Sequence, residues 1–577
     1  MTTTSAPAAP SFLMKLPVGR SMSTRIAFFG AAGVTLICLL WLMHLRTTGA
    51  FHNLAPIFAV MLGYFDYQAT MGALLILLGA MFLSASPLMR GVLRRIGEHP
   101  GLIAIGTGIV LCMGSLMVYR NHPLSMDEYA PFLQSQAFAA GHLKAHFLPE
   151  YLDWMIPKAF QNKFLVVSTT SGEVMSIYWP SFALLLTPFT FAGIPWACNP
   201  VLSALTVLVI HRLAMRLFND DREAAGLAVL LTIASPVFFA SGISYYSMTA
   251  HLLANGVFAL LLLDPTPRRL VLAGLVGSIA LTLHNPVPHL LFAAPWGVWL
   301  ATRPNTFRNL LCIGLGYLPL SLLLGIGWFW MQHDLMGQGV TGAAAEVSSA
   351  FALPTGDILF ARFAGVVKVW LWAVPGLMLI ACMGAWKWRA DERVKLLVAS
   401  AILTLVGYAF VPMDQGHGWG YRYFHSAWLI LPLLGAAAFA RVPPSTRSHA
   451  GAMTSDADLR SFFVAAALLT LAVGVPQRAL QMREFMNDHL GQLPHYPGTE
   501  PRVVLVDVTN AFYGYDLVQN HALLKDDVTT LLGRSPAENA EVMKSFKPGY
   551  HRVYTDFRGE VWSAAAPMPQ AQSAPAH

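Results

Sequence analysis

The sequence predicts an all-α polytopic membrane protein with a small α/β domain near its C-terminal end. Hydrophobic residues make up 55% of the 577 residues, and charged residues make up only 12%. Apolar runs of about 20 residues, the length of a transmembrane helix, recur along the chain. Lys and Arg are concentrated in the short segments between these runs, as in multi-pass membrane proteins. A soluble domain of ordinary composition is more polar.

The apolar runs predict about thirteen transmembrane helices. They cover residues 26–45, 70–88, 101–119, 197–217, 223–242, 249–264, 269–284, 287–301, 308–330, 361–386, 396–412, 426–441 and 461–476. The first run lacks a small-residue cleavage site, so we expect a membrane anchor and not a cleaved signal peptide. Residues 1–100 form an N-terminal region with two of these helices, and residues 101–476 form the main membrane module.

The basic residues predict the orientation of the chain. If the thirteen runs alternate across the membrane, the basic segments fall on one side, which is the cytoplasm. These segments contain Arg20, Arg94, Arg212, Arg269, Arg303, Arg393 and Arg441. We therefore expect an inner-membrane protein with a cytoplasmic N-terminus and a periplasmic or extracellular C-terminal domain. The formal charge of +7 comes from basic residues in these short segments and therefore reflects membrane topology. We expect membrane lipids and no nucleic acid as partners.

Two outer segments are large enough to form structure of their own. The loop 120–196 contains an apolar run at 178–194 that several prolines interrupt, and we expect it to form a juxtamembrane helix. In the second segment, residues 502–508 and 551–557 are predicted to be strands. A helix is predicted at 535–546, with Ser535 as N-cap and Glu538 completing a capping box. We expect an α/β domain at 477–560 and a disordered tail at 561–577.

Ionisable side chains are scarce in the apolar runs and gather at their outer ends. The stretch HPLSMDEYAPFL places two adjacent carboxylates, Asp127 and Glu128, at the start of a helix in the first outer loop. His251, Lys368 and the segment PMDQGHGWGYRYFH, with its His417 and Arg422, belong to the same boundary. A polar site at the membrane surface suits a substrate that is part lipid and part polar.

Each of these residues also has a structural interpretation. Ser125 and Glu128 have the spacing of a capping box, which would occupy Glu128 and leave Asp127 free. Arg422 could anchor to lipid headgroups, and His251 could be a hydrogen-bonded residue at a helix end. Asp127, Glu128 and His417 could together bind a divalent metal, although no ligand spacing requires one. The five cysteines show no metal-site or disulfide spacing.

Three motifs, in order, resemble those of the GT-C glycosyltransferases. They are MDEYAPFLQSQAFAAGHL (126–143), IYWPSFALLLTPF (177–189) and GWGYRYFHSAWLILPLL (418–434). The resemblance is to the protein mannosyltransferase and aminoarabinose transferase group and covers roughly residues 101–440 and the outer tail domain. The sequence differs from that group in having Trp-Pro-Ser where two prolines are common, and in the two helices expected before residue 100.

The resemblance implies an enzyme that transfers a sugar from a polyprenyl-phosphate donor to a lipid, glycan or protein acceptor outside the cytoplasmic membrane. It implies inversion, with an outer-loop acid as general base and basic groups at the donor phosphate. We assign Asp127 and Glu128 as the catalytic candidates. The candidates for binding the donor phosphate or substrate are Arg422, His417, Tyr421, Tyr423, Tyr178, His251 and Lys368. No cofactor is expected beyond the divalent metal left open above.

Two other functions are compatible with the sequence. A transporter or flippase of a lipid-linked glycan would share an amphipathic cavity, but such a protein usually needs acids within the membrane. A non-catalytic scaffold that binds envelope glycans would not need an acid, an arginine and histidines at one boundary.

Overall fold

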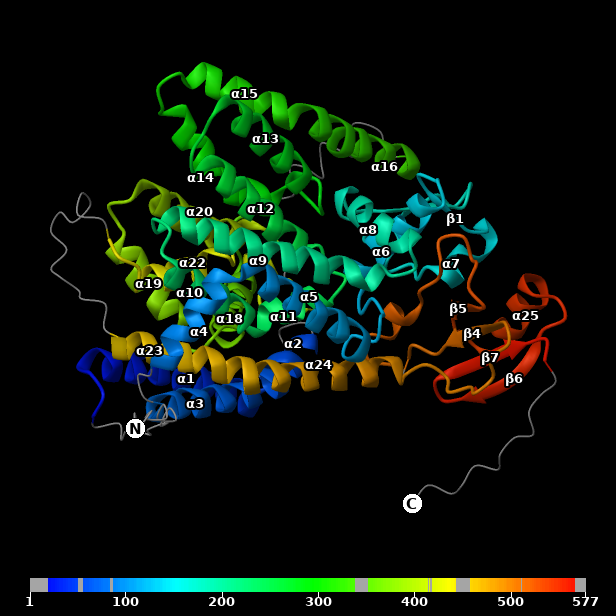
Figure 1. The fold of residues 1–577 in the computed structure, drawn as a ribbon. Coiled ribbons are helices and arrows are strands. Elements are labelled where there is room, and N and C mark those ends of the chain that lie inside the picture. The colour runs from blue at the N-terminus through cyan, green and yellow to red at the C-terminus, as the bar shows by residue number, and fades with distance from the viewer. Residues whose placement is uncertain are drawn as a thin grey trace, which may run out of the picture.

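The fold is described by a computed structural model that covers residues 19–49, 56–83, 87–337, 351–413, 415, 418–442, 457–509 and 511–565. Helices form the larger part, and four strands near the C-terminus form the principal sheet. Figure 1 shows the long helices packed side by side, with strands β4 to β7 gathered at one end of the molecule. The predicted fold class, a polytopic α-helical protein with a small α/β part, is confirmed.

Among the described residues, seven helices are long and apolar enough to cross a membrane. They cover Met22–Thr48, Ile57–Phe82, Pro100–Met117, Pro195–Leu217, Thr306–Met336, Glu392–Phe410 and Ala457–Leu490. An eighth span results if α10 (Arg222–Ile233) and α11 (Pro236–Ile243) are counted together, although they meet at an angle of 61°. Pro236 begins α11 and cannot donate a backbone hydrogen bond to α10, which accounts for the break.

The other expected spans coincide with shorter helices. These are α12 (Met248–Leu262), α13 (Pro267–Leu281), α14 (Val287–Ala301) and α22 (Ile430–Ala437). The run 361–386, expected to be one helix, is divided into α18 (Gly356–Leu371) and α19 (Leu377–Lys387). Pro375 and Gly376 lie in the break between them, and Gly376, the N-cap of α19, has φ +82°, a conformation that a continuous helix does not allow. The number of thirteen crossings therefore stays a prediction.

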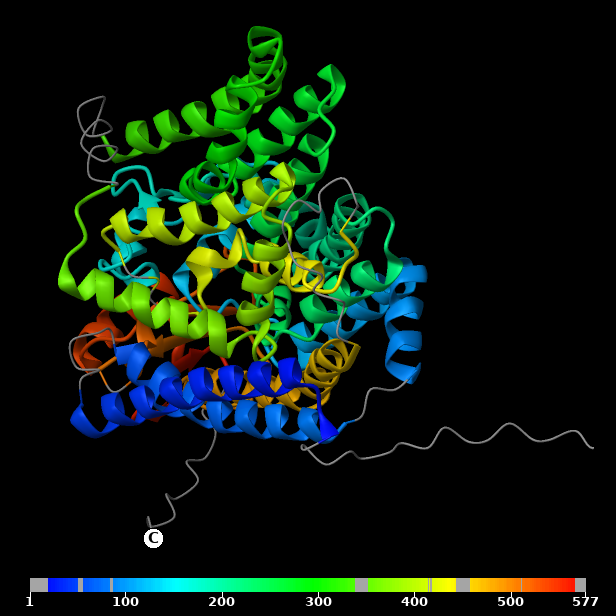
Figure 2. The ribbon, with the colours of Figure 1, turned by 90° about the vertical axis from the view of Figure 1, so that its left-hand side faces the viewer.

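Small residues allow neighbouring helices to approach closely. A Cβ atom on Gly274 of α13 would lie 2.1 Å from the carbonyl oxygen of Ile313, and one on Gly316 would lie 2.1 Å from that of Val271. Both Gly316 and Ile313 belong to α15 (Thr306–Leu320). Backbone contact of this kind is a common basis of helix packing in membranes. Figures 1 and 2 show α13, α14 and α15 projecting together from the rest of the bundle.

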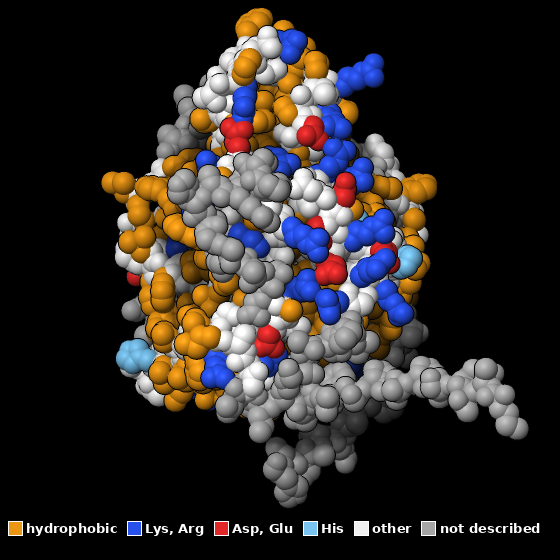
Figure 3. All heavy atoms as spheres, turned by 60° about the vertical axis from the view of Figure 1, so that its left-hand side comes forward, with side chains coloured by type: hydrophobic (Ala, Val, Ile, Leu, Met, Phe, Trp, Pro, Cys, Tyr) orange, Lys and Arg blue, Asp and Glu red, His pale blue; other side chains and the backbone are white. Residues whose placement is uncertain are grey.

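Basic side chains gather at one end of the bundle. Figure 3 shows Lys and Arg side chains gathered on the face that lies at the left of Figure 1, away from the C-terminal sheet. Ion pairs join several of these loops, including Arg216 to Asp264 at 2.7 Å and Arg222 to Glu98 at 3.4 Å. The predicted topology requires such a separation, with basic loops at one end and the C-terminal domain at the other. Which end is cytoplasmic remains a prediction.

The first outer loop contains more structure than the sequence suggested. Helix α6 (Met126–Ala139) carries the paired acids, and a sheet of order β1-β3-β2 follows it. Its strands are β1 (Ala145–His146), β2 (Leu165–Val167) and β3 (Glu173–Ser176). As expected, the interrupted apolar run forms a helix, α8 (Ser181–Phe191).

The C-terminal part extends the predicted α/β domain. Its sheet has the order β5-β4-β7-β6, and β4 and β5 are parallel. The strands are β4 (Arg502–Val506), β5 (Val528–Leu532), β6 (His551–Asp556) and β7 (Gly559–Ser563), with α25 at Pro536–Phe546. The capping box of Ser535 and Glu538 is confirmed, but β5 and β7 were not predicted.

Two elements cross the predicted limits of this domain, and the limits themselves stay a prediction. Helix α24 (Val475–Leu490) continues well past the expected boundary at residue 476, and β7 crosses the one at 560. The end of the predicted tail, from residue 566, lies outside the described residues.

Candidate active site

Asp127 lies where three distant segments meet. It is the second residue of α6, and its Oδ2 accepts a hydrogen bond of 2.8 Å from Nη1 of Arg422, which lies 295 residues away at the start of α21 (Arg422–His425). Its Oδ1 accepts a hydrogen bond from the hydroxyl of Tyr178, just before α8. The Asp127 side chain is 19% exposed and that of Arg422 is 8% exposed. The structure thus brings together three of the predicted site residues.

Arg422 is held by its own loop and by an aromatic ring. Its amide donates to Oε1 of Gln415 at 2.9 Å, and its Nη2 donates to the Gln415 carbonyl. The guanidinium lies 4.5 Å from the ring centre of Tyr246, in a cation–π contact. Its Nε atom is buried and has no hydrogen-bond partner within the described part of the chain.

Glycine at position 418 makes room for this arginine. Gly418 has φ +142°, and a Cβ atom there would lie 2.6 Å from Cδ of Arg422. Any larger side chain would therefore strain the backbone and displace the guanidinium. The Gly-rich character of this loop has a direct steric reason.

The surroundings keep Asp127 ionised. Burial raises the pKa of its carboxyl group, but the charge of Arg422, the field of His284 and the Tyr178 hydrogen bond outweigh burial and bring the pKa below its usual 3.8. His284 stacks on the Tyr178 ring with centroids 3.9 Å apart. Asp127 is therefore a carboxylate at neutral pH, able to accept a proton, although Arg422 reduces its basicity.

Glu128 is fully buried, and three donors occupy its carboxyl group. Oε2 accepts from the amide of Leu124 at 2.8 Å and from the Tyr119 hydroxyl at 3.1 Å, and Oε1 accepts from the amide of Tyr245 at 2.8 Å. Burial raises the pKa of Glu128 to about 8, against the opposing effect of these donors. The side chain joins the start of α6 to the segment that follows α11.

The predicted capping box at Ser125 is wrong. The Ser125 side chain makes no capping hydrogen bond and instead pairs with the Tyr246 hydroxyl at 2.9 Å. Glu128 binds the amide of Leu124 and not that of Ser125. Glu128 is held by backbone amides, although not in a capping box, whereas Asp127 is not free, contrary to expectation, but pairs with Arg422 and Tyr178.

The other tyrosines of the late outer loop pack away from Asp127. Tyr423 stacks on Tyr408 with centroids 4.3 Å apart, and Tyr421 is buried where a Cβ on Gly365 would meet its ring. Arg362, which the sequence did not single out, donates to the carbonyls of Tyr408 at 2.7 Å and Val411 at 2.9 Å. These contacts hold residues 408–411 against α18, and substrate binding by Tyr421 and Tyr423 stays a prediction.

Lys368 belongs to a neighbouring buried cluster. Its Nζ lies 3.9 Å from Oδ2 of Asp66. Oδ1 of Asp66 pairs with the Arg478 guanidinium at 2.8 Å and accepts a hydrogen bond of 2.8 Å from Nε1 of Trp372. Asp66 lies inside the helical span Ile57–Phe82, so the membrane helices are less free of acids than the sequence indicated. Its pairing with Arg478 supplies the compensation that a buried charge requires.

Two predicted histidines have different outcomes. His251, on α12, is buried, and neither ring nitrogen has a hydrogen-bond partner among the described residues. His417 lies outside the described residues, as does the metal proposal that included it. Among the residues that the structure describes, no group of three or more His, Cys, Asp or Glu side chains is placed to hold a metal ion.

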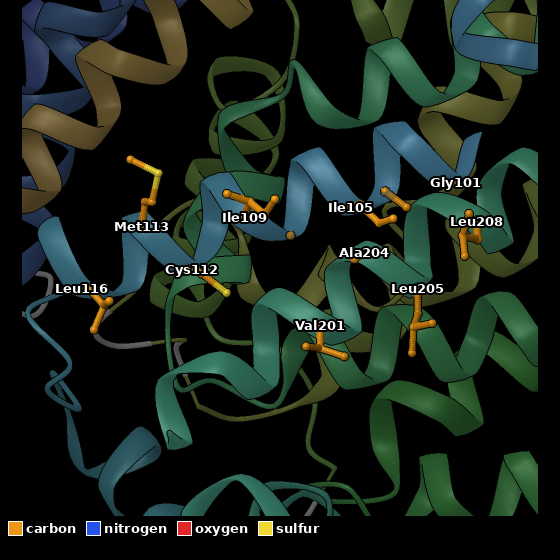
Figure 4. Close-up of a pocket in the computed structure, with 12 residues that line it drawn as sticks. Gly101, Ile105, Ile109, Cys112, Met113, Leu116, Val201, Ala204, Leu205 and Leu208 are labelled. Carbon is orange, nitrogen blue, oxygen red and sulfur yellow. The ribbon is translucent and has the colours of Figure 1, made fainter. Parts of the chain in front are cut away.

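An apolar groove runs between α5 (Pro100–Met117) and α9 (Cys198–Leu217), with a volume of about 570 Å³. Figure 4 shows Ile109, Cys112 and Leu116 of α5 beside Val201 and Leu205 of α9 along it. Both helices lead to the site. Leu116 precedes Tyr119, which binds Glu128, and Asn199 of α9 donates to the Tyr246 carbonyl at 2.8 Å.

Comparisons with known proteins concern the fold. No protein-family model and no curated protein matches the sequence. Two crystal structures of ArnT from Cupriavidus metallidurans, one bound to undecaprenyl phosphate and one in the apo state, match with TM-scores of 0.51 and 0.50. Each is 12% identical, and each match covers 81% of this chain and 99% of ArnT. The chain therefore has the fold of ArnT, and the resemblance read from its motifs is confirmed at the level of the fold.

Proposed function

We propose that this protein is a membrane glycosyltransferase that uses a polyprenyl-phosphate-linked sugar and transfers the sugar, with inversion, to an acceptor on the outer face of the cytoplasmic membrane. The observation that carries the proposal is the buried contact between Asp127 and Arg422. It places a proton acceptor beside a cation that can bind phosphate.

The chemistry needs both groups. The acceptor hydroxyl attacks the anomeric carbon, a carbon–oxygen bond forms, and the bond to the phosphate oxygen breaks. Asp127 takes the hydroxyl proton as general base, an effect worth about 10²–10⁴-fold. The leaving polyprenyl phosphate carries the negative charge, which the Arg422 guanidinium stabilises by charge-assisted hydrogen bonds.

The contact between the two residues gives the reaction an order. While Arg422 pairs with Asp127, it lowers the basicity of the carboxylate. A donor phosphate competes for the same guanidinium, whose Nε has no partner among the described residues. Binding of the donor then weakens the hold of Arg422 on Asp127 and restores its basicity before the acceptor reacts.

The groove between α5 and α9 suits the apolar part of such a donor. Its lining is almost entirely apolar, and its outer end lies a few residues from the groups that bind Glu128 and Tyr246. The ArnT structure that contains undecaprenyl phosphate supports a ligand of this kind. We propose that the chain of the donor lies along this groove.

A transporter or flippase is less well supported. The buried acid of the membrane helices, Asp66, is paired with Arg478, whereas a coupling site must bind and release an ion. The fold agrees with a transferase.

Purified protein tests the proposal directly. It is mixed in detergent with synthetic polyprenyl-phosphate sugars and a lipid extract of the host envelope, and free polyprenyl phosphate and new glycosylated products are measured by mass spectrometry. We expect donor cleavage that depends on the extract, with the anomeric configuration of the product inverted by NMR. A transporter would leave every donor intact in detergent, and a product with retained configuration would refute the proposed displacement.

A further inference from the structure

A segment of the C-terminal domain lies along the helix that carries Asp127. Oδ1 of Asp516 accepts a hydrogen bond of 2.8 Å from the amide of Met126, the first residue of α6 and 390 positions earlier in the chain. Asp516 is buried, with 7% of its surface exposed. It supplies the cap that Ser125 does not provide.

Further contacts hold the same segment in place. The side chain of Gln519 donates to the carbonyl of Pro123 at 2.8 Å. The Tyr129 hydroxyl accepts from the amide of Asn520 at 2.8 Å and donates to the carbonyl of the same residue at 2.5 Å. Residues 516–522 thus follow α6 from its first residue, and we call them the α6 strap.

The cap is placed to affect Asp127 without touching it. The first amides of a helix have no partner within the helix, and a carboxylate acceptor there fixes the first turn. Asp127 directly follows the capped residue, so the direction of its side chain depends on that turn. The ionised carboxylates of Asp516 and Asp127 would also repel each other, and burial together with this repulsion raises the pKa of Asp516 to about 7.

We propose that Asp516 is a positioning residue for Asp127, through which the C-terminal domain sets the geometry of the general base. The inference rests on the proposed function for its effect on rate, while the contact itself can be measured without any assay of transfer. It assigns the outer domain a role in the chemistry of the membrane module. A shift of about 1 Å in a reacting group can cost on the order of 100-fold in rate.

Two substitutions of Asp516 separate capping from charge. The side-chain oxygen of Asn can accept the same hydrogen bond from the Met126 amide, so Asp516→Asn should keep kcat within about threefold of the wild type. Asp516→Ala removes the acceptor, and we expect kcat to fall about 10- to 100-fold while KM for the donor changes little. Asp526→Ala, an exposed acid of the same domain, is the matched control and should behave as wild type.

A double-mutant cycle with Asp127→Asn tests whether the effect passes through the base. If Asp516 acts by positioning Asp127, Asp516→Ala should cost little more once the base is gone. If it only supports the fold, the loss should be equally large in both backgrounds. Should Asp516→Ala fail to fold, Asp516→Glu, which displaces the carboxylate by one methylene, replaces it with the same expectation.

Hydrogen–deuterium exchange reports on the contact independently of activity. The peptide containing residues 126–129 should exchange faster in Asp516→Ala than in wild type, Asp516→Asn and Asp526→Ala. The inference is overturned if kcat is unchanged in Asp516→Ala, if Asp516→Asn is equally impaired, or if the loss persists with Asp127→Asn. If wild-type protein transfers no sugar, the proposed function fails and this inference fails with it, whereas unchanged exchange with active wild-type enzyme refutes the inference alone.

Discussion

The substitution Asp127→Asn tests the proposed general base with little change in shape. The amide can turn so that its oxygen accepts from Arg422 and its nitrogen donates to the Tyr178 hydroxyl, because both partners of the carboxylate remain in place. What the amide cannot do is accept a proton. We therefore expect kcat to fall about 10²–10⁴-fold, equivalent to about 3–5 kcal/mol of transition-state stabilisation.

The assay follows product formation from a defined polyprenyl-phosphate sugar and separates kcat from KM. Loss of an interaction made only in the transition state lowers kcat and leaves KM similar. Asp153→Asn is the control, since Asp153 lies in the same outer loop and pairs at 3.0 Å with Lys158, which is 77% exposed. Surface ion pairs contribute about 0–1 kcal/mol, so this variant should keep full activity. Activity of Asp127→Asn within threefold of wild type would refute the assignment.

Three further outcomes are expected. Arg422→Lys should lower transfer at least about 100-fold, because an ammonium lacks the planar fork that can hold the loop carbonyl while it binds the phosphate that displaces Asp127, and unchanged activity would reduce the arginine to a structural anchor. Burial raises the pKa of Glu128 from 4.5 to about 8, so its stabilising effect is present below about pH 4.5 and is lost as the pH rises towards 8. Glu128→Gln should accordingly flatten the fall in Tm of purified protein between about pH 5 and pH 8, and an unaltered slope contradicts this. In a background without the native cysteines, Cys at the exposed positions Ser171 and Ser545 should react with an impermeant reagent in intact cells, whereas Cys at Ala390 should not, and the reverse pattern would overturn the predicted orientation.

The fold was predictable because apolar length and basic loops are properties of the local sequence. Each expected span coincides with helix, and the helix and capping box at 535–546 were found from spacing alone. The break at 372–376 was missed because apolar composition continues through it, although the adjacent Pro375 and Gly376 are residues that favour a turn. Asp66 was not expected within a membrane helix, because the apolar run was predicted to begin at residue 70. The observed helical span begins at Ile57 and includes Asp66.

The site was predictable only in part. Asp127, Tyr178 and Arg422 were selected from motifs, and the structure places them in contact. Tyr246 and Gln415, which hold Arg422, have no motif that distinguishes them from other tyrosines and glutamines. Their role depends on which distant segments the fold brings together, and the spacing of residues in a single sequence does not show this.

The same capping rule succeeded at Ser535 and failed at Ser125, and the difference has a physical cause. Ser535 and Glu538 are exposed, so water is the main competitor for their hydrogen bonds. Each side chain accepts a hydrogen bond from the backbone amide of the other residue, and the Ser535 amide lies 3.2 Å from the Glu538 carboxylate. At the start of α6 the same types of group are buried among other partners. Tyr246 takes the Ser125 hydroxyl, and Asp516 takes the first free amide of the helix. A local rule therefore predicts the hydrogen bonds of a helix terminus that is exposed to water. The partners of a buried terminus depend on the whole fold, because distant segments pack against it. At the start of α6 one such partner is Asp516 of the C-terminal domain, which contacts the helix that carries Asp127.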